Sequence, residues 1–488
     1  MNKTHIFIAI FVFAGVGFVL SASAQVTAVR TLPGEMYLPS DPLTITIEVT
    51  GDPGAIIVVE TPPAEWSIRA SSGGKLSDGV ITWNLESFNG STTLRYYATP
   101  PRTATDEALF SGVVGDQEIS GMSRMAQYEM PADLRLPQTT GPYEIGTVLV
   151  RLIDESRGEA RTSDDPNDKR ELMVQIWYPA DVPESQSPGL VCPDFEAVRS
   201  FFEAGLPVGS RFWDCMEAFL GNAVWDAPVL NKGLLYPVLI FSHGSTAFRW
   251  QNVSLFEELA SHGYVIASID HTYSAIAVHF PDGRVIPSRG AGQLAVLVQD
   301  VRFVLDQLGA MDWGHDFDSL NEVLDFERVG VFGMSHGGTV TTLTMQDDAR
   351  FKAGVVLDMS LGASKLDQPV MFLHDGISPG GRLESALGGG GYDCKIRGTA
   401  HHDFSVGPLL WRLSLMPGKW PISSDTDDPV RVSRIIADYT LAFFDKILKG
   451  QRVPLLDGPS PNYPEVEFTI YGEPQGLSGI SFEEWTLY

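Results

Sequence analysis

The feature that most constrains this fold is the pentapeptide GMSHG at residues 333–337, which has the spacing G-x-S-x-G. A buried strand is predicted immediately before it and a helix after it, over residues 339–345. On such a sharp turn the hydroxyl of Ser335 is exposed, and Gly333 and Gly337 let neighbouring backbones pass without Cβ clashes. The pattern predicts a nucleophile elbow; the competing interpretation is a glycine-rich turn with an idle serine.

Two different patterns of hydrophobic residues divide the chain. Over residues 143–488, strand-like runs alternate with helical ones, which predicts an α/β-hydrolase fold with a mostly parallel sheet and helices on both faces. Over 25–130, short alternating runs separated by Gly, Pro, Asn and Asp predict an all-β sandwich. Residues 131–142 are interpreted as a linker. The aromatic-rich stretch 184–235 is interpreted as a cap-like insertion near the site or, alternatively, as a satellite core on the sheet edge.

A serine hydroxyl attacks an ester only when a base takes its proton and an acid orients that base. In this fold the acid and then the histidine follow the serine along the chain. Asp358 ends the strand predicted after the elbow helix, so it should point into the active-site crevice. His401 and His402 lie in the loop after the last predicted central strand, and either could be the base. Asp367 and Asp375 are rival acids that also suit turns.

An ester hydrolase also needs two amide donors for the oxyanion of the tetrahedral intermediate. The backbone amide of His336, directly after the serine, is one candidate. The second should come from the loop after an earlier central strand, where Gly244 lets the backbone turn so that the Ser245 amide faces the substrate. The remaining histidines of this region are interpreted as orienting or structural (His243, His262 and His271).

Composition excludes several classes of function. The chain has 34 Lys and Arg against 61 Asp and Glu, a formal net charge of −27. This is the opposite of the basic footprint that nucleic-acid binding needs, and it disfavours adhesion to anionic lipid by charge. With 44% hydrophobic residues the chain is not a disordered polypeptide. No CxxC, HExxH or clustered carboxylate loop is present, so neither a metal nor a cofactor is expected.

Residues 1–24 have the layout of a secretory signal peptide. Lys3 lies in a short charged start, residues 6–20 are apolar, and Ala-Ser-Ala at 22–24 precedes the expected cleavage site. The alternative is a membrane anchor, but the apolar run is shorter than the roughly 20 residues that a bilayer requires. We therefore expect a secreted or periplasmic protein without a stable membrane span after cleavage.

Three cysteines are too few for a disulfide framework in a secreted chain of this size. Cys192 and Cys215 could bridge locally within the insertion, which would leave Cys394 unpaired. The sequence does not decide between this bridge and three thiols.

Several segments together resemble the plasma (group VII, isoform II) platelet-activating-factor acetylhydrolase family of α/β-hydrolase lipases and esterases. FSHGSTAFRW and LASHGYVIASIDH are similar to its oxyanion loop and next strand, and GMSHGG to its nucleophile elbow. VVLDMSLG resembles its acid-bearing strand and IRGTAHHDF its histidine loop. The resemblance covers about residues 143–450 and leaves out the β-rich segment and most of the insertion.

Position by position, the resemblance implies that Ser335 is the nucleophile, Asp358 the acid and His401, the first histidine of its loop, the base. It implies that Ser245 and His336 supply the oxyanion amides. The activity implied is a secreted serine carboxylic-ester hydrolase that forms an acyl-enzyme on short-chain or phospholipid-like esters, including 1-alkyl-2-acetylglycerophosphocholine. No cofactor is implied.

Three other functions remain open from the sequence. The chain could be a polyester or short-chain esterase without phospholipid activity, or a peptidase or amidase on the same scaffold. It could also be a non-catalytic protein whose β-rich domain tethers it to a surface or polymer. The intact set of serine, aspartate and histidine favours an enzyme that acts on a small-molecule or lipid ester.

Overall fold

The computed structural model divides the chain into two compact units, Met1–Tyr128 and Glu129–Tyr488. Residues 1–24, which the sequence predicts to be a signal peptide, lie outside the described residues. The structure describes residues 26–472, 474 and 476, apart from 38–41, 102, 103, 105, 106, 163, 166, 311–317, 360, 361, 364, 377–385 and 417.

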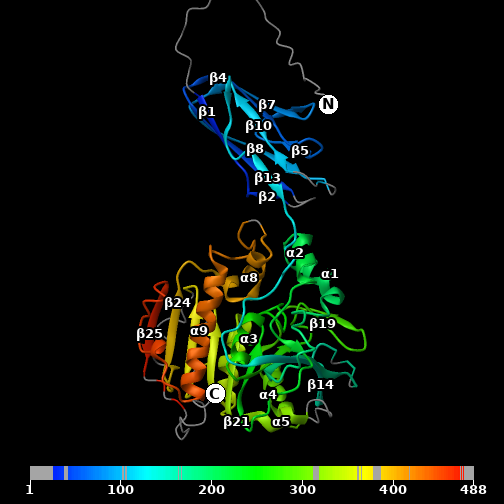
Figure 1. Cartoon of the computed structure of the whole chain (residues 1–488), viewed down its shortest axis with the longest axis vertical. Coiled ribbons are helices and arrows are strands. Elements are labelled where there is room, and N and C mark those ends of the chain that lie inside the picture. The colour runs from blue at the N-terminus through cyan, green and yellow to red at the C-terminus, as the bar shows by residue number, and fades with distance from the viewer. Residues whose placement is uncertain are drawn as a thin grey trace, which may run out of the picture. The chain divides into compact units, whose positions relative to one another are not determined.

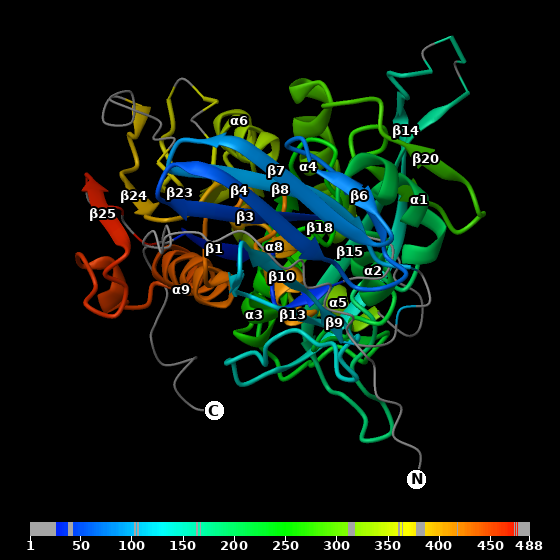
Figure 2. The same cartoon turned by 90° about the horizontal axis from the view of Figure 1, so that it is seen from above.

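The first unit is a β-sandwich, as predicted. Its two largest sheets each have five strands among the described residues, and side chains from both sheets form one core that includes Ile45, Ile47, Val58 and Trp83. Figure 2 shows that the long strands run in similar directions. One sheet has the order β12 (Ser120–Gly121), β1 (Val26–Thr31), β3 (Leu43–Gly51), β8 (Ser91–Thr99), β5 (Ser67–Ala70), and the other β11 (Gln117–Glu118), β10 (Ser111–Val114), β4 (Gly54–Thr61), β7 (Val80–Phe88), β6 (Lys75–Ser77).

The alternating run at residues 108–114, which the sequence pattern predicts as one strand, forms two strands. β9 (Ala108–Leu109) joins a small sheet with β13 (Arg124–Gln127) and β2 (Met36–Tyr37), whereas β10 pairs with β4. Phe110, between them, is buried in the core. A hydrophobic run alone does not show where a chain changes its hydrogen-bonding partner.

The second unit contains the predicted α/β sheet, which has ten strands among the residues that the structure describes (Figure 1). Its central strands are parallel. At one edge β25 is antiparallel to its neighbour, and toward the other edge β15 is antiparallel to both of its neighbours, whereas the edge strand β16 pairs parallel with β14. The order is β16 (Val224–Trp225), β14 (Glu144–Gly158), β15 (Lys169–Ala180), β18 (Val265–Asp270), β17 (Tyr236–Ser242), β21 (Leu324–Met334), β22 (Phe351–Leu357), β23 (Val370–His374), β24 (Gly391–Ile396), β25 (Val466–Tyr471).

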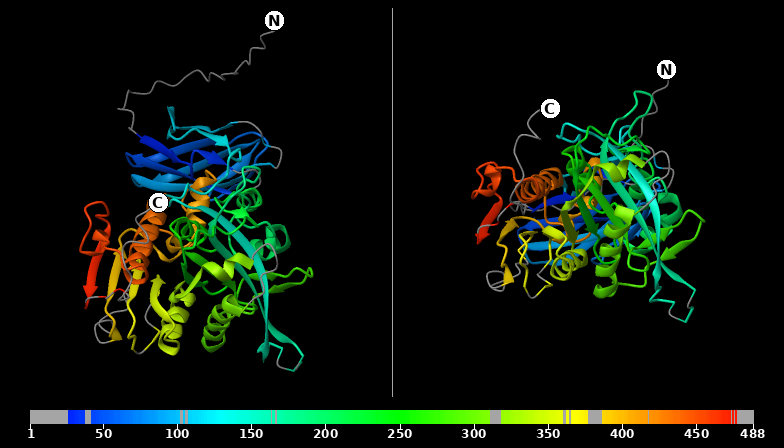
Figure 3. Two further views of the ribbon diagram at one scale, coloured as in Figure 1. Left: turned by 60° about the horizontal axis from the view of Figure 1, so that its bottom comes forward. Right: turned by 90° about the horizontal axis from the view of Figure 1, so that it is seen from below.

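Helices cover both faces of this sheet (Figure 3). α3 (Val253–Ser261) and α9 (Pro429–Leu448) contact each other and pack on one face, while α4 (Leu294–Ala310) and α6 (His336–Asp347) pack on the other. Because both faces are covered, β17 and β18 are buried along their whole length, which explains their mostly apolar sequences. The carboxyl ends of the parallel strands are therefore where polar side chains can meet a ligand.

The boundary between the units falls directly after Tyr128. Residues 131–142, interpreted above as a linker, belong to the second unit, where Leu134 and Leu136 are buried. Leu136 N–H donates to the carbonyl of Leu220, and Leu220 N–H donates to the carbonyl of Leu134. This segment is thus paired with the insertion 184–235 as an ordered strand-like stretch.

The insertion, which we call the cap insertion (residues 184–235), contains α1 (Phe195–Gly205), α2 (Ser210–Met216) and β16. Cys192 and Cys215 are buried within it as thiols and form no disulfide, and Cys394 is also a buried thiol. In the part of the chain that the structure describes, no helix is long and apolar enough to cross a membrane.

Candidate active site

The predicted nucleophile elbow, residues 333–337, forms the junction between β21 and α6. Ser335 lies between them with φ 54° and ψ −122°, a backbone conformation that costs free energy for any residue with a Cβ. A Cβ on Gly337 would collide with the carbonyl oxygen of Ser242, and one on Gly333 would collide with the backbone of Gly337. The two glycines are therefore required by the close approach of β17 to the elbow.

The structure brings Ser335, His401 and Asp358 into one hydrogen-bonded chain. His401 Nε2 lies 2.9 Å from Ser335 Oγ, and His401 Nδ1 contacts Asp358 Oδ2. Asp358 is buried and also accepts a bond of 2.8 Å from the backbone N–H of Asp375. When Nδ1–H donates to the carboxylate, the lone pair of Nε2 is left to accept the Ser335 hydroxyl proton.

The rival residues lie elsewhere. The ring of His402 lies edge-on to that of His401, with the ring centres 5.6 Å apart, and its backbone N–H donates to Ser423. Burial lowers the pKa of His402. Asp367 is exposed and forms an ion pair with Lys365. The backbone of Asp375 supports Asp358, which gives it a supporting rather than a rival position.

Asp403 holds the histidine loop in place, and sequence reasoning missed it. Its buried carboxylate accepts bonds from the backbone N–H groups of Ala400 (2.8 Å), Asp425 (3.0 Å) and Thr426 (3.2 Å) and from the hydroxyl of Ser424 (2.5 Å). An acidic residue three positions after the start of a helical turn is a capping signal. That spacing, Ala400 to Asp403, could have identified it.

The loop that follows β17, which we call the oxyanion loop (residues 243–247), lies beside the elbow. A Cβ on Gly244 would be 3.4 Å from the Cβ of Ser335. Gly244 N–H already donates to Gln251 Oε1 at 2.8 Å, whereas the Ser245 N–H has no acceptor among the described residues. His336 is the first residue of α6, where backbone N–H groups have no intrahelical acceptor. The backbone N–H groups of the two predicted oxyanion donors, Ser245 and His336, are thus free to donate to a substrate. The sequence analysis missed Gln251, because its bond to Gly244 exists only in the folded loop.

A pocket of about 260 Å³ opens beside Ser335 and His401. Five of its wall residues come from the cap insertion, so this insertion lies near the site as predicted rather than forming only a separate core. Among the described residues that line the pocket there is no Asp, Glu, Lys or Arg. Its apolar and aromatic wall consists mainly of Phe202, Leu206, Phe212, Trp213, Met216, Phe248, Trp250, Leu410 and Trp420.

Buried ion pairs fix the cap insertion to the sheet. Arg249, just after the oxyanion loop, donates to Asp194 at the start of α1 (2.6 Å) and to Asp270 at the end of β18 (2.7 Å). All three side chains are largely buried. Among the described residues, no group of three or more His, Cys, Asp or Glu side chains could hold a metal ion.

Comparisons with known proteins identify the family of the chain. The family model described as "Platelet-activating factor acetylhydrolase, isoform II" matches residues 128–287 and 293–376. A platelet-activating factor acetylhydrolase of Cavia porcellus is 24% identical over 70% of this chain and 86% of its own length. A probable 1-alkyl-2-acetylglycerophosphocholine esterase of Arthroderma benhamiae is 26% identical over 70% of this chain and 95% of its own length.

Among solved structures, a ferulic acid esterase from Streptomyces cinnamoneus superposes with a TM-score of 0.58 and 29% identity. The alignment covers 69% of this chain and all of the esterase chain. The α/β-hydrolase architecture of the second unit is thereby confirmed.

Proposed function

We propose that this chain, which belongs to the platelet-activating factor acetylhydrolase, isoform II, family of hydrolases, cleaves carboxylic esters. The residues that we propose to carry out the reaction are Ser335, His401 and Asp358. One observation carries the proposal: these three side chains form a continuous hydrogen-bonded chain that ends at the mouth of an apolar pocket. Such an arrangement activates a hydroxyl only where a substrate carbonyl can reach it, and the pocket provides that access.

In the proposed mechanism, His401 Nε2 takes the hydroxyl proton while Ser335 Oγ attacks the ester carbonyl carbon. Asp358 holds the Nδ1–H tautomer and stabilises the imidazolium that forms. The amides of Ser245 and His336 donate to the oxyanion. His401 then protonates the leaving alcohol, which departs and leaves an acyl-enzyme. A water molecule that His401 deprotonates hydrolyses this ester and restores the serine.

The substrate that we propose is a neutral ester whose acyl group enters the aromatic pocket. The names of the relatives favour an acetylated or similarly short-chain phospholipid. No acidic side chain lines the described wall of the pocket, so only its aromatic rings could attract a choline cation there, through cation–π contacts. The second candidate is a non-phospholipid ester with a bulkier apolar acyl group, which the aromatic wall and the ferulic acid esterase neighbour favour.

The first test is hydrolysis of p-nitrophenyl acetate by the purified chain, with Ser335→Ala as the matched control. Activity in the wild type that the variant lacks would support the proposal, and equal activity in both would contradict it. Comparing an acetylated phospholipid with p-nitrophenyl esters from C2 to C16 would then separate the two candidate substrates. Ester and amide analogues of one acyl group would separate an esterase from a peptidase.

Export is a further part of the proposal, and it rests on the sequence of residues 1–24. Expression in a host with a secretion pathway should yield a protein that begins at Gln25. Mass spectrometry of the exported protein would measure this directly. An intact N-terminus on protein that stays with the membrane fraction would instead support an anchor.

A further inference from the structure

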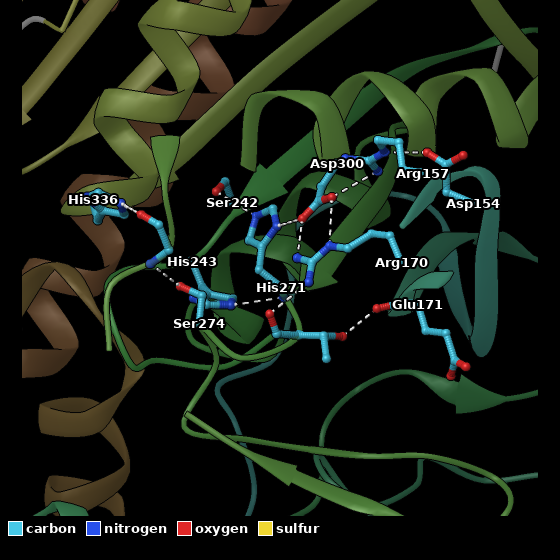
Figure 4. Close-up of polar contacts among 12 residues, drawn as sticks. Asp154, Arg157, Arg170, Glu171, Ser242, His243, His271, Ser274, Asp300 and His336 are labelled. Carbon is cyan, nitrogen blue, oxygen red and sulfur yellow. Dashed lines mark hydrogen bonds and ion pairs between the residues drawn. The ribbon is translucent and has the colours of Figure 1, made fainter. Parts of the chain in front are cut away.

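A second set of aspartate, histidine and serine lies behind the oxyanion loop (Figure 4). Asp300 Oδ2 is 2.9 Å from His271 Nδ1, and His271 Nε2 is 2.9 Å from Ser242 Oγ. Arg170 forks onto the carboxylate of Asp300, with Nε 3.1 Å from Oδ1 and Nη2 2.5 Å from Oδ2. The side chains of His271 and Asp300 are 0% exposed, so no substrate reaches them. We call this set the buried array. Any effect that it has on the reaction must be transmitted by the residues that surround it.

The protonation states of the buried array follow from its charges. Burial alone would raise the pKa of Asp300, but Arg170 and the bond from His271 hold that pKa well below its usual range. Arg157 adds a second ion pair at 3.0 Å. An ionised carboxylate only accepts, so His271 Nδ1 carries the hydrogen. Burial lowers the pKa of His271, so the ring is neutral and its Nε2 accepts from the hydroxyl of Ser242.

Ser242 connects the buried array to the elbow. It is the last residue of β17 and pairs with Gly333 of β21. Its carbonyl oxygen occupies the space in which a side chain on Gly337 would lie. The hydroxyl bond to His271 therefore fixes the point at which β17 leaves the sheet and the oxyanion loop begins.

His243 carries this constraint into the oxyanion loop. Its Nε2 accepts the backbone N–H of His271 at 3.2 Å, and its Nδ1–H donates to the Gly244 carbonyl at 2.6 Å. Burial lowers the pKa of His243 to about 3, so the ring is neutral and can make both bonds. In a trans peptide the C=O of Gly244 and the N–H of Ser245 point in opposite directions. Holding the carbonyl against His243 therefore aims the Ser245 N–H away from that ring.

The second oxyanion donor is tied to the same neighbourhood. The ring Nε2–H of His336 donates to the Gly292 carbonyl at 3.0 Å, and Gly292 N–H donates to Ser274 Oγ at 3.1 Å. The carbonyl of Ser274 accepts from Thr246 N–H in the oxyanion loop, while Ser274 N–H donates to the His271 carbonyl. The residues that carry both donors thus share a support in the turn that follows β18.

We propose that His243, His271 and Asp300 are positioning residues that orient the oxyanion donors toward the ester carbonyl. The inference rests on the proposed function, because it assumes that Ser335 attacks an ester. None of the three side chains lines the pocket, so they act through the backbone of the oxyanion loop rather than on the substrate. They should therefore stabilise the transition state, in which the oxyanion exists, and leave the affinity for the substrate almost unchanged.

A matched pair of substitutions at His243 tests this proposal. In His243→Asn, the side-chain amide nitrogen can take the place of Nδ1 and still donate to the Gly244 carbonyl. In His243→Gln, the amide lies nearer the place of Nε2, so that donation is lost. We expect His243→Gln to lower kcat about 10- to 100-fold with KM within about threefold, and His243→Asn to restore most of this loss. His262→Gln is the control and should change kcat less than about twofold, because His262 caps the C-terminal end of α3 and its ring contacts Thr140 and Glu258 rather than the oxyanion loop.

A second readout separates positioning from a merely structural role. A trifluoromethyl ketone forms a tetrahedral adduct with the serine, so its affinity depends on the oxyanion donors. His243→Gln should weaken this inhibitor by about the same factor as it lowers kcat/KM, while circular dichroism and the urea midpoint report on folding. If His243→Gln does not fold, Ser242→Ala takes its place, with an expected decrease in kcat of about threefold to tenfold.

The outcomes distinguish the two proposals. An inactive wild type would overturn the proposed function itself. An active wild type with equal kcat and inhibitor affinity in the folded Gln and Asn variants would overturn only the positioning role. A loss confined to KM, or a Ser242→Ala variant with unchanged kcat, would do the same.

Discussion

Two serine–histidine–aspartate sets share one hydrogen-bond pattern in this protein, yet they differ in almost everything else. In both, a histidine Nδ1 contacts a carboxylate and its Nε2 lies 2.9 Å from a serine hydroxyl. The His401 side chain is 30% exposed at a pocket, whereas that of His271 is 0% exposed. Ser335 occupies a strained turn before a helix, whereas Ser242 ends an ordinary strand. The pattern alone therefore does not identify a nucleophile. The proposed role of Ser335 rests also on its access to a pocket, its strained turn and the nearby amides of Ser245 and His336.

Removing each serine hydroxyl is the sharpest test of this comparison. Ser335→Ala should lower kcat for p-nitrophenyl acetate by about 10⁴- to 10⁶-fold, because the three residues act as a unit. Ser242→Ala should lower it by no more than about tenfold, since it only relaxes the oxyanion loop. Spectrophotometric turnover of the two purified variants measures both effects. A similar loss of turnover in the two variants would mean that the exposed and the buried serine hydroxyl are equally important for the reaction.

The neighbouring histidines 401 and 402 provide the second test. His401→Ala should abolish labelling by a fluorophosphonate, which phosphonylates a reactive serine, and should lower turnover about 10⁴-fold, because the proton of Ser335 then has no acceptor. His402→Ala should remain within about tenfold of the wild type. Peptide mass spectrometry locates the label, which we expect on Ser335 and never on Ser242. The opposite behaviour of the two variants would move the base to His402.

The cap insertion gives a smaller effect that depends on substrate length. Leu206→Ala removes part of the pocket wall and should lower kcat/KM for p-nitrophenyl octanoate by about tenfold. The rate for the acetate should change little, because an acetyl group is too small to reach far into the pocket. Leu235→Ala, at an exposed residue that does not line the pocket, is the control. An equal loss for both esters would mean that the cap insertion does not contact the acyl chain.

The smallest expected effect concerns stability and pH. The pKa of His243 is about 3 when folded, against about 6.5 when unfolded, so the unfolded chain binds more protons between these values. The unfolding free energy should therefore fall as the pH is lowered from 6.5, and His243 should account for roughly 1.4 kcal/mol of this per pH unit. Urea unfolding between pH 6.5 and 4.5 should show that the unfolding free energy of His243→Gln depends less steeply on pH than that of the wild type. An unchanged slope would contradict a buried neutral imidazole.

Local patterns point to the turn at Ser335 and to the order of its proposed partners along the chain. The G-x-S-x-G spacing lies within five residues, and Asp358 and His401 each follow a recognisable strand. β14 gives a weaker sequence signal, because it lies near the sheet edge, where charged and partly exposed residues interrupt its apolar sequence. Strand boundaries depend on partners that are distant in sequence, and a hydrophobic run does not encode them.

The buried array could not be assembled from the sequence, because its members are brought together by sheet order. Arg170 on β15 lies 130 residues from Asp300 on α4, and β15 pairs with β18, which His271 directly follows. One local signal was available. Asp300 stands within the apolar stripe of α4, between Leu297 and Val304, where an acid is costly to bury unless it is paired.

The support of the oxyanion loop has a practical meaning for protein engineering. His243 and Gly244 face the interior, whereas Ser245 and Thr246 face outward. Mutant libraries that vary the outward pair leave the inner scaffold intact, so most members should fold and differ in selectivity. Libraries that randomise the inward pair would spend most of their diversity on misfolded clones.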